Sequence, residues 1–315
     1  MGRSEVFLGV GYGPSKIRLG LLERDGRIQQ ETVLELKNCS ASGVIPYLTE
    51  VIGSFLQEQG GIRPTAIGIG LPGYINPEKG IWMHCLSMGV RSPIALAPAL
   101  REEFGVPVYI DNDLNAATLA ENYFGIGRIC RDFLFAAVDE GVAMGIVADG
   151  RLIRGVANCA GELGHVMAES GGELCACNSH GCLENIVSSS GLVTQAKRQV
   201  AAYPNSPLCA LQEITTDDIF RCAQAGDELS LRLAHRAVCA LGIGLVNSIN
   251  LLNPEHIVVS GSVCRNAWFV DQVRRHVYAN GFVSSVATLK ELSHSNINPK
   301  HTEILGAASL CFVPM

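Results

Sequence analysis

Apolar residues alternate with small residues over the first part of the chain, a period that is typical of strands. We expect residues 6–22 to form two strands joined by a turn at Gly13-Pro14. Asp25-Gly26 predicts a tight hairpin turn, after which residues 27–36 extend the sheet. The sequence therefore begins with three successive strands.

Apolar residues then recur at helical spacing, and the helices alternate with short buried strands. Further strands are predicted at 66–71 and 106–110, and helices at 43–58, 94–104 and 114–124. A second series begins near residue 132 with a strand, a turn and a strand at 133–147, then a hairpin turn at Asp149-Gly150. It continues with a strand at 256–260 and with helices at 190–201, 216–225, 229–252, 271–278 and 306–312.

The order of elements is repeated along the chain. Three strands, a helix, a strand and a helix follow one another twice, starting near residues 6 and 132. This repetition predicts an α/β protein of two related halves, each a mixed sheet flanked by helices. A length of 315 residues is enough for two such cores.

Composition and charge narrow the class of protein. No apolar run reaches the ~18–20 residues that span a bilayer, and the richest segment, 237–252, is interrupted by Asn and Ser and is expected to be a buried helix. The short polar start shows no signal-peptide pattern, so we expect a cytoplasmic protein without a membrane partner. The net charge of -6 disfavours a broad nucleic-acid footprint on this chain.

The chemistry of the chain is concentrated between residues 161 and 184. With no export signal, the 12 cysteines are expected to be reduced thiols and metal ligands. Cys175 and Cys177 are too close to bond each other without strain, but both can ligate one ion together with Cys182 and His165. A Cys₃His set closes the tetrahedral sphere of Zn²⁺, which predicts a structural ion. His180 is a rival ligand, and chance clustering of cysteines is the alternative.

Two carboxylates accompany these ligands. Glu162 stands three residues before His165, and Glu184 follows Cys182 closely. A zinc ion would hold Glu162, His165 and Glu184 together, and two carboxylates with an imidazole suit the hydroxyls of a sugar.

The segment resembles the signature of the ROK family, named for repressor, open reading frame and kinase. Its members carry Glu-x-Gly-His followed by Cys-x-Cys-Gly-x-x-Gly-Cys-x-Glu, which this chain matches except at Asn178, where the family usually has Gly. The resemblance implies sugar contacts from Glu162, His165 and Glu184. It also implies a zinc site whose ligands are His165, Cys175, Cys177 and Cys182.

The resemblance covers nearly the whole chain from Phe7 and implies a fold. ROK proteins have the actin-like ATPase, ribonuclease-H-like duplicated fold, with two lobes and a central cleft. We therefore expect a small lobe at 1–115, joined by a C-terminal helix at about 303–315, and a large lobe at 116–302. The zinc-binding insertion would be 161–184. A homodimer or homotetramer is expected.

A candidate base follows the strand predicted at 106–110. Asn112-Asp113 resembles the family's Asn-Asp dipeptide, whose Asp is the catalytic base in kinases and whose Asn binds sugar. Gly73, after the strand at 66–71, is added to the expected sugar site. The alternative is that Asp113 caps the helix that begins near Leu114.

The phosphate-binding loops depart from the family pattern. Kinases of the family begin with Asp-x-Gly-Gly-Thr-Lys, whereas this chain has Gly-Tyr-Gly-Pro-Ser-Lys at 11–16, and Pro lacks an amide donor. The usual Gly-Thr-Gly-x-Gly-Gly-Gly is Asp-Glu-Gly-Val-Ala-Met-Gly at 139–145. Each of the two carboxylates would repel a polyphosphate by ~1–4 kcal/mol. The expected degenerate nucleotide site comprises Gly11, Gly13, Ser15, Lys16, Gly141, Gly145 and Gly261.

The departures fall on the nucleotide side, while the sugar side is intact. This pattern resembles the family's sugar-responsive repressors, such as the N-acetylglucosamine and xylose repressors. We expect the effector-sensing domain of such a regulator, with structural Zn²⁺, a hexose or amino-sugar ligand, and DNA bound only through a helix-turn-helix absent from this chain. One alternative is a hexose or N-acetylhexosamine kinase that uses ATP and Mg²⁺. Another is an actin-like structural subunit without a ligand.

Overall fold

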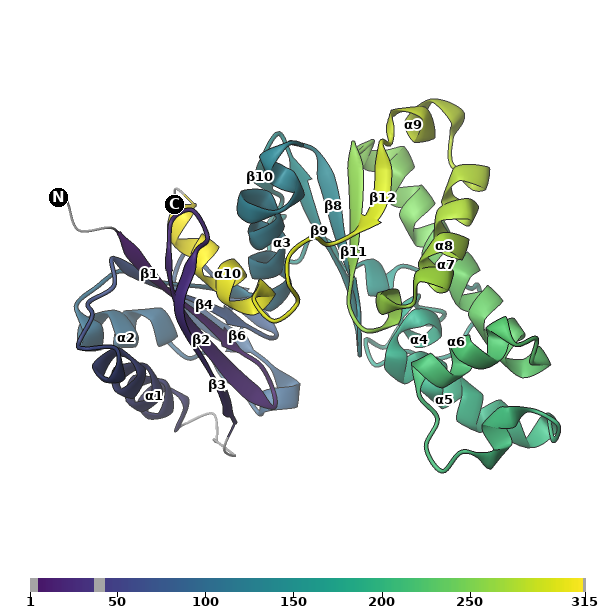
Figure 1. The fold of residues 1–315 in the computed structure, drawn as a ribbon, viewed down its shortest axis with the longest axis horizontal. Coiled ribbons are helices and arrows are strands. Elements are labelled where there is room, and N and C mark those ends of the chain that lie inside the picture. The colour runs from purple at the N-terminus through teal and green to yellow at the C-terminus, as the bar shows by residue number, and fades with distance from the viewer. Residues whose placement is uncertain (1–4, 37–42, 314–315) are drawn as a thin grey trace. The chain divides into compact units, whose positions relative to one another are not determined.

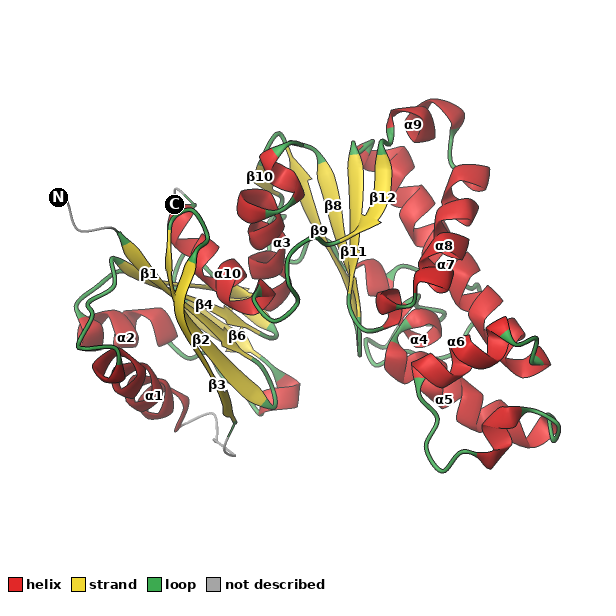
Figure 2. Ribbon diagram, in the orientation of Figure 1, coloured by secondary structure: helices red, strands yellow, loops and turns green. Residues whose placement is uncertain are grey.

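The structure is a computed structural model that describes residues 5–36 and 43–313 (Figures 1 and 2). The chain splits into two compact units. The first comprises Met1–Ile129, Gly150–Cys159 and Asn296–Met315, and the second comprises Cys130–Asp149 and Ala160–Ser295. The lobe boundaries expected from the sequence, at 115 and 302, stay a prediction.

The first unit is built on a sheet with the strand order β3-β2-β1-β4-β7. The strands β1, β2 and β3 are antiparallel neighbours, whereas β4 and β7 run parallel to β1. The carboxyl ends of β1, β4 and β7 therefore meet at one edge, where ligand groups collect in open α/β sheets. The strands span β1 (Val6–Tyr12), β2 (Lys16–Glu23), β3 (Ile28–Glu35), β4 (Ala66–Leu71) and β7 (Val108–Asn112).

Helices cover both faces of this sheet. On one face α1 (Val44–Glu58) and α2 (Leu96–Phe104) pack through apolar side chains that the helical spacing identifies (Figure 1). On the other face α3 (Asp113–Phe124) and α10 (Thr302–Ser309) form a separate apolar cluster with alternate residues of the strands. The almost fully buried β1 and β4 are typical of strands that are covered on both sides.

The backbone of α10 lies directly on β1 and β4 because two strand positions lack a side chain. A Cβ at Gly9 would lie 2.1 Å from the carbonyl oxygen of Ile304, and one at Gly68 would lie 1.8 Å from that of Ala307. These glycines therefore fix how closely the C-terminal helix approaches the sheet. The helix also begins at Thr302, four residues before the predicted start at 306.

A short antiparallel hairpin follows β4. It consists of β5 (Tyr74–Asn76) and β6 (Ile81–His84), which form a two-stranded sheet, and Trp82 of β6 also forms a bridge with Ile94. The sequence analysis did not predict this hairpin, because three or four residues are too few to show a period.

The second sheet repeats the topology of the first. Its order is β10-β9-β8-β11-β12, with β8 and β9 antiparallel and with β11 and β12 parallel to β8. The predicted duplication is therefore confirmed in strand order. The strands span β8 (Phe133–Val138), β9 (Val142–Ala148), β10 (Arg151–Leu152), β11 (His256–Ser260) and β12 (Glu291–His294), of which β12 was not predicted.

A long apolar helix is the centre of the second unit's core. By length and composition α7 (Glu228–Leu252) could cross a membrane, but 67% of its most apolar window is buried, as in the core helix of a globular unit. The helices α6 (Thr216–Gln224) and α8 (Ala267–Asn280) pack with it, and they stack Phe220 on Phe269 at 4.8 Å between ring centroids. The remaining helices are α4 (Glu184–Val187), α5 (Ser189–Gln199) and α9 (Val283–Thr288).

Candidate functional site

Three thiols and one imidazole form a compact cluster in the second unit. One ligand atom from each of His165, Cys175, Cys177 and Cys182 lies within 4.8 Å of the others. The Sγ atoms of Cys177 and Cys182 are 3.6 Å apart, and Cys175 Sγ is 3.8 Å from His165 Nδ1. Ligands ~2.3 Å from a tetrahedral ion stand about 3.8 Å from one another, whereas a disulfide bond is about 2.05 Å long. The spacing fits a tetrahedral metal ion.

A tight turn places the first two thiols. The Cys175 amide donates to the Ser179 carbonyl at 2.7 Å, and the Asn178 amide donates to the Cys175 carbonyl at 2.9 Å. Asn178 has φ 68, a left-handed conformation that Gly adopts freely and Asn tolerates. This explains why Asn can replace the family's usual Gly. The rival ligand His180 is exposed and lies outside the cluster.

The thiols of the metal-free cluster differ in acidity. Burial raises the pKa of Cys182 to about 12. The backbone amide of Ser179 instead lowers the pKa of the exposed Cys177. A bound dication deprotonates coordinating thiols outright, so these differences describe the cluster before an ion enters.

His165 serves two sets of neighbours through its two ring nitrogens. Nδ1 faces the thiol of Cys175, whereas Nε2 lies 3.9 Å from Glu162 Oε2. Both side chains are partly exposed, at 35% for His165 and 59% for Glu162. A metal ion on Nδ1 would therefore leave the proton on Nε2 free to donate to Glu162 or to a ligand.

Glu184 opens α4 directly after the cluster. Its Oε2 accepts a hydrogen bond from the Val142 amide at 2.9 Å. A Cβ on Gly164 would lie 3.1 Å from the same oxygen, so the carboxylate also lies beside the residue that precedes His165. The structure thus brings the predicted sugar contacts of this unit to one region and ties them to the loop after β8.

That loop uses its own donors internally. The Asp139 amide donates to the Gly141 carbonyl at 2.9 Å, and the Asp139 carboxylate accepts from Ser262 Oγ at 2.6 Å. Asp139, Glu140 and Gly141 are exposed, whereas Gly145 is buried inside β9 opposite Phe135. Met144, the sixth residue of the segment 139–145, belongs to the apolar core. Gly261, just before Ser262, has φ 98.

In the first unit, Asn112 caps the helix that follows it. Its Oδ1 accepts from the Leu114 amide at 2.9 Å and from the Asn115 amide at 3.4 Å, and its Nδ2 donates to the Gly73 carbonyl at 3.0 Å. Gly73 has φ 90, and a Cβ there would lie 2.4 Å from the His84 carbonyl oxygen. Asn112, and not Asp113, is therefore the helix cap. Capping was the alternative role that the sequence analysis considered for Asp113.

Asp113 stands at the start of α3 with an altered acidity. Part of the Asp113 side chain reaches solvent, yet the protein packed around its carboxyl removes water from it and raises its pKa from 3.8 to about 6. The Leu114 amide partly opposes this rise, and the nearby Glu303 adds to it. A carboxylate with a pKa near neutral accepts a proton at physiological pH more readily than an ordinary one.

A buried ion pair beside Asn112 was not visible in the sequence. Asp111 is fully buried, and its Oδ2 accepts from Arg154 Nε at 3.1 Å, while its Oδ1 accepts from Asn115 Nδ2 at 3.0 Å. This pair holds the end of β7 and thereby positions Asn112 and Asp113. Nothing in the local pattern around Arg154 indicates it.

The turn after β1 offers few donors to an anion. The Gly13 amide donates to the Lys16 carbonyl at 3.0 Å, and Pro14 has no amide hydrogen. Gly11 lies against α10: a Cβ there would be 2.6 Å from Glu303 Cβ and 2.9 Å from its Oε2. Glu303, which the sequence analysis missed, is held by Arg18 Nε at 3.2 Å.

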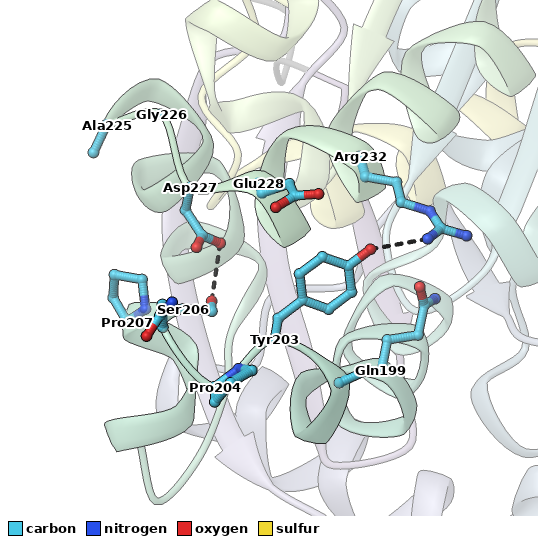
Figure 3. Close-up of a pocket in the computed structure, with 12 residues that line it drawn as sticks. Gln199, Tyr203, Pro204, Ser206, Pro207, Ala225, Gly226, Asp227, Glu228 and Arg232 are labelled. Carbon is cyan, nitrogen blue, oxygen red and sulfur yellow. Dashed lines mark hydrogen bonds between the residues drawn. The ribbon is translucent and has the colours of Figure 1, made fainter.

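A separate hollow of about 940 Å³ lies between the end of α5 and the turn that joins α6 to α7 (Figure 3). Arg232 Nη1 donates to the hydroxyl of Tyr203 at 3.0 Å, and Ser206 Oγ donates to Asp227 Oδ2 at 2.9 Å. The predicted site residues are not among those that line this hollow.

Known proteins that resemble this chain include both kinases and regulators. A family model described as the ROK family matches residues 7–311. A glucokinase from Halalkalibacterium halodurans is 32% identical over 267 residues, which are 82% of this chain and 81% of that protein. The Escherichia coli K12 DNA-binding transcriptional repressor Mlc is 30% identical over 266 residues, which are 83% of this chain and 64% of the repressor. A crystal structure of a ROK family transcriptional regulator, a homolog of Mlc, is 28% identical with a TM-score of 0.88, covering 98% of this chain and 78% of that one.

The contact between Gly11 and Glu303 predicts a steric coupling. Gly11→Ala should lower the free energy of unfolding by about 1–3 kcal/mol, because the added methyl overlaps Glu303 Cβ. In a Glu303→Gly background the same change should cost at least about 1 kcal/mol less, as a double-mutant cycle by urea denaturation would measure. Gly53→Ala in α1, where a Cβ meets nothing within 4 Å, is the control and should not destabilise. Strict additivity would contradict the contact.

The raised pKa of Asp113 predicts a pH-dependent effect of removing its charge. The native state disfavours the ionised carboxyl, so this group's penalty grows as pH rises from about 4 through 6. Asp113→Asn removes the penalty. Its gain in melting temperature over the wild type should therefore widen by at least about 2 °C between about pH 4.5 and pH 7.5, and then level off. A difference that is constant across this range in differential scanning fluorimetry would refute the assignment.

Proposed function

Because the chain belongs to the ROK family and has its actin-like ATPase fold, we propose that it is a sugar-binding, effector-sensing domain of a carbohydrate-responsive regulator. The observation that carries this proposal is the state of the two loops that would cradle phosphates. In the first loop the Gly13 amide is already bonded and Pro14 has no amide hydrogen, and the second loop carries two exposed carboxylates, whereas the sugar and metal residues that the resemblance implies are all present.

The electrostatics of the loops oppose a nucleotide. Phosphoryl transfer depends almost entirely on positioning and on stabilising charge at the phosphates. Asp139 is fixed by Ser262, and Glu140 lies beside it in the exposed turn after β8. In the other loop, Gly13 has its amide engaged and Pro14 has none to offer. These features support a site that binds a triphosphate poorly.

We propose that the Cys₃His cluster binds a structural Zn²⁺. Three thiolates and His165 Nδ1 complete a tetrahedral sphere and leave no position for substrate. The proton on Nε2 then becomes a fixed donor, since the metal determines the tautomer of the ring. Zinc would in this way orient His165 towards Glu162 and a sugar hydroxyl.

Each unit offers polar groups that we propose as sugar contacts. Glu162, His165 and Glu184 supply acceptors and one donor in the second unit. In the first unit Asn112 holds the Gly73 carbonyl with one amide hydrogen and keeps the other for a ligand. Acceptors and donors of this kind suit a hexose or an amino sugar. A regulator of this kind would bind DNA through a helix-turn-helix outside this chain and would act as a homodimer or homotetramer.

A kinase is the second candidate function. The raised pKa of Asp113, together with the glucokinase relative at 32% identity, favours it. In that case Asp113 would take the proton of the attacking sugar hydroxyl, and ATP with Mg²⁺ would supply the phosphoryl group. The loop residues would then have to bind phosphate without the usual backbone donors.

The zinc proposal predicts the result of losing one thiol. Cys177→Ser should reduce the zinc content by one equivalent per chain and lower the melting temperature by about 5 °C or more, because an ion held by four ligands is lost. Metal analysis by mass spectrometry and thermal melting measure both. Cys209→Ser, which removes an exposed thiol outside the cluster, should keep the wild-type zinc content. Freshly purified wild type without zinc would disprove the site.

The sensor proposal predicts sugar binding without turnover. Calorimetry over a panel of hexoses and N-acetylhexosamines should find a ligand, and a coupled ATPase assay should stay below the ordinary enzyme range of ~1–10³ s⁻¹. Glu184→Ala should weaken the binding of that ligand at least about tenfold, as the loss of a hydrogen bond to a partly buried carboxylate predicts.

Two further variants separate the causes of such a loss. Glu184→Gln still accepts from the Val142 amide, so a loss of affinity in it points to the carboxylate charge rather than to the loop. Glu173→Ala, which removes a surface carboxylate paired with Arg198, should bind as the wild type does. Turnover within the enzyme range on any sugar would instead establish the kinase.

A further inference from the structure

A second group of metal-ligating side chains lies in the second sheet, at the strand ends opposite to the loop that carries Asp139. Cys130 precedes β8, and Glu255 and His256 stand at the start of β11, with one ligand atom from each within 4.8 Å of the others. Since β8 and β11 are parallel and His256 pairs with Phe133, this group lies at their amino ends (Figure 1). Asp139 follows the carboxyl end of β8, about 20 Å away along a six-residue strand.

Two of the three ligands are buried. Cys130 is 3% exposed and His256 is 8% exposed. Within residues 5–36 and 43–313, His256 Nδ1 is the one buried side-chain nitrogen or oxygen without a hydrogen-bond partner. A buried polar atom left without a partner costs ~1–3 kcal/mol. The surrounding protein therefore offers this ring nitrogen no hydrogen-bond partner.

The thiol beside it has only weak partners. Cys130 Sγ contacts the Asp132 carbonyl at 3.3 Å and Glu255 Oε2 at 3.4 Å. Burial raises the pKa of Cys130 to about 11, so the metal-free protein keeps this proton. Two further charged neighbours are Asp132, whose carboxylate adds to the raised pKa of Cys130, and Lys290, which pairs with Glu255 and lowers the pKa of that carboxyl.

We propose that Cys130, Glu255 and His256 form a second cation site, which takes a divalent ion of borderline softness such as Zn²⁺. Sulfur, imidazole and carboxylate are the three ligand classes that this ion accepts, and softer thiolate ligation disfavours Mg²⁺ and Ca²⁺. Coordination releases the thiol proton to solvent and gives the ring nitrogen a partner. Three protein ligands leave one position for water, unlike the closed Cys₃His cluster.

The site would join two strands that pair in the sheet but are separated by a long stretch of sequence. Cys130 and His256 are separated by the whole of the core helix α7 and the metal cluster before it. An ion between them would clamp the amino ends of β8 and β11. Lys290, just before β12, is 66% exposed and can leave Glu255 when the ion binds.

The test counts zinc ions per chain. Full-length protein is stripped with a chelator and titrated with Zn²⁺ against a chromogenic competitor. The wild type should take up two equivalents, Cys130→Ser and His256→Gln one each, and Cys177→Ser one. The double variant Cys130→Ser/Cys177→Ser should take up none. Cys209→Ser is the matched thiol control and should bind two, as the wild type does.

The result distinguishes this site from the first. Equal uptake by wild type, Cys130→Ser and His256→Gln would show that the group is only a thiol–carboxylate contact and would overturn the proposal, whatever Cys177→Ser does. Circular dichroism establishes that each variant is folded. Glu255→Gln, at a partly exposed position, decides the matter if the buried variants unfold: it should weaken the second equivalent at least about tenfold, and unchanged affinity would refute the site.

Discussion

In each sheet, three parallel strands end at a common edge. This constraint determines where the candidate site residues that follow those strands lie. In the first sheet the carboxyl ends of β1, β4 and β7 bring Gly11, Gly73 and Asn112 to one edge. In the second sheet β8 and β11 do the same for Asp139 and Ser262, whose hydrogen bond joins the loops that follow the two strands. Residues far apart in sequence become neighbours because the strands that precede them pair in parallel.

Glu184 links two functions that sequence motifs treat separately. It belongs to the sugar and zinc signature, yet its carboxylate is bound to the Val142 amide at the end of the loop after β8. The proposed sugar contacts of the second unit and the loop after β8 therefore share one side chain. If a ligand competes for Glu184 it would release the loop, so that binding at the proposed sugar site would change the backbone structure there.

Features with a local cause could be predicted, and features that depend on distant pairing could not. The helix α7, most strands of the two sheets and the Cys₃His ligands follow from periodicity and short spacings, and the family and fold that the resemblance implies are confirmed. Arg154 reaching Asp111 across 43 positions leaves no local pattern, nor do Cys130 and His256, which meet only because β8 and β11 pair. The short β5, β6 and β12 have too few residues to show a period.

The packing of Glu303 against Gly11 makes a substitution at either position depend on the residue at the other. A side chain at residue 11 would overlap Cβ of Glu303, so it should be tolerated more easily once residue 303 is glycine. Gly11 is thus one half of a two-position state rather than an independent site. The two positions should therefore change together among relatives.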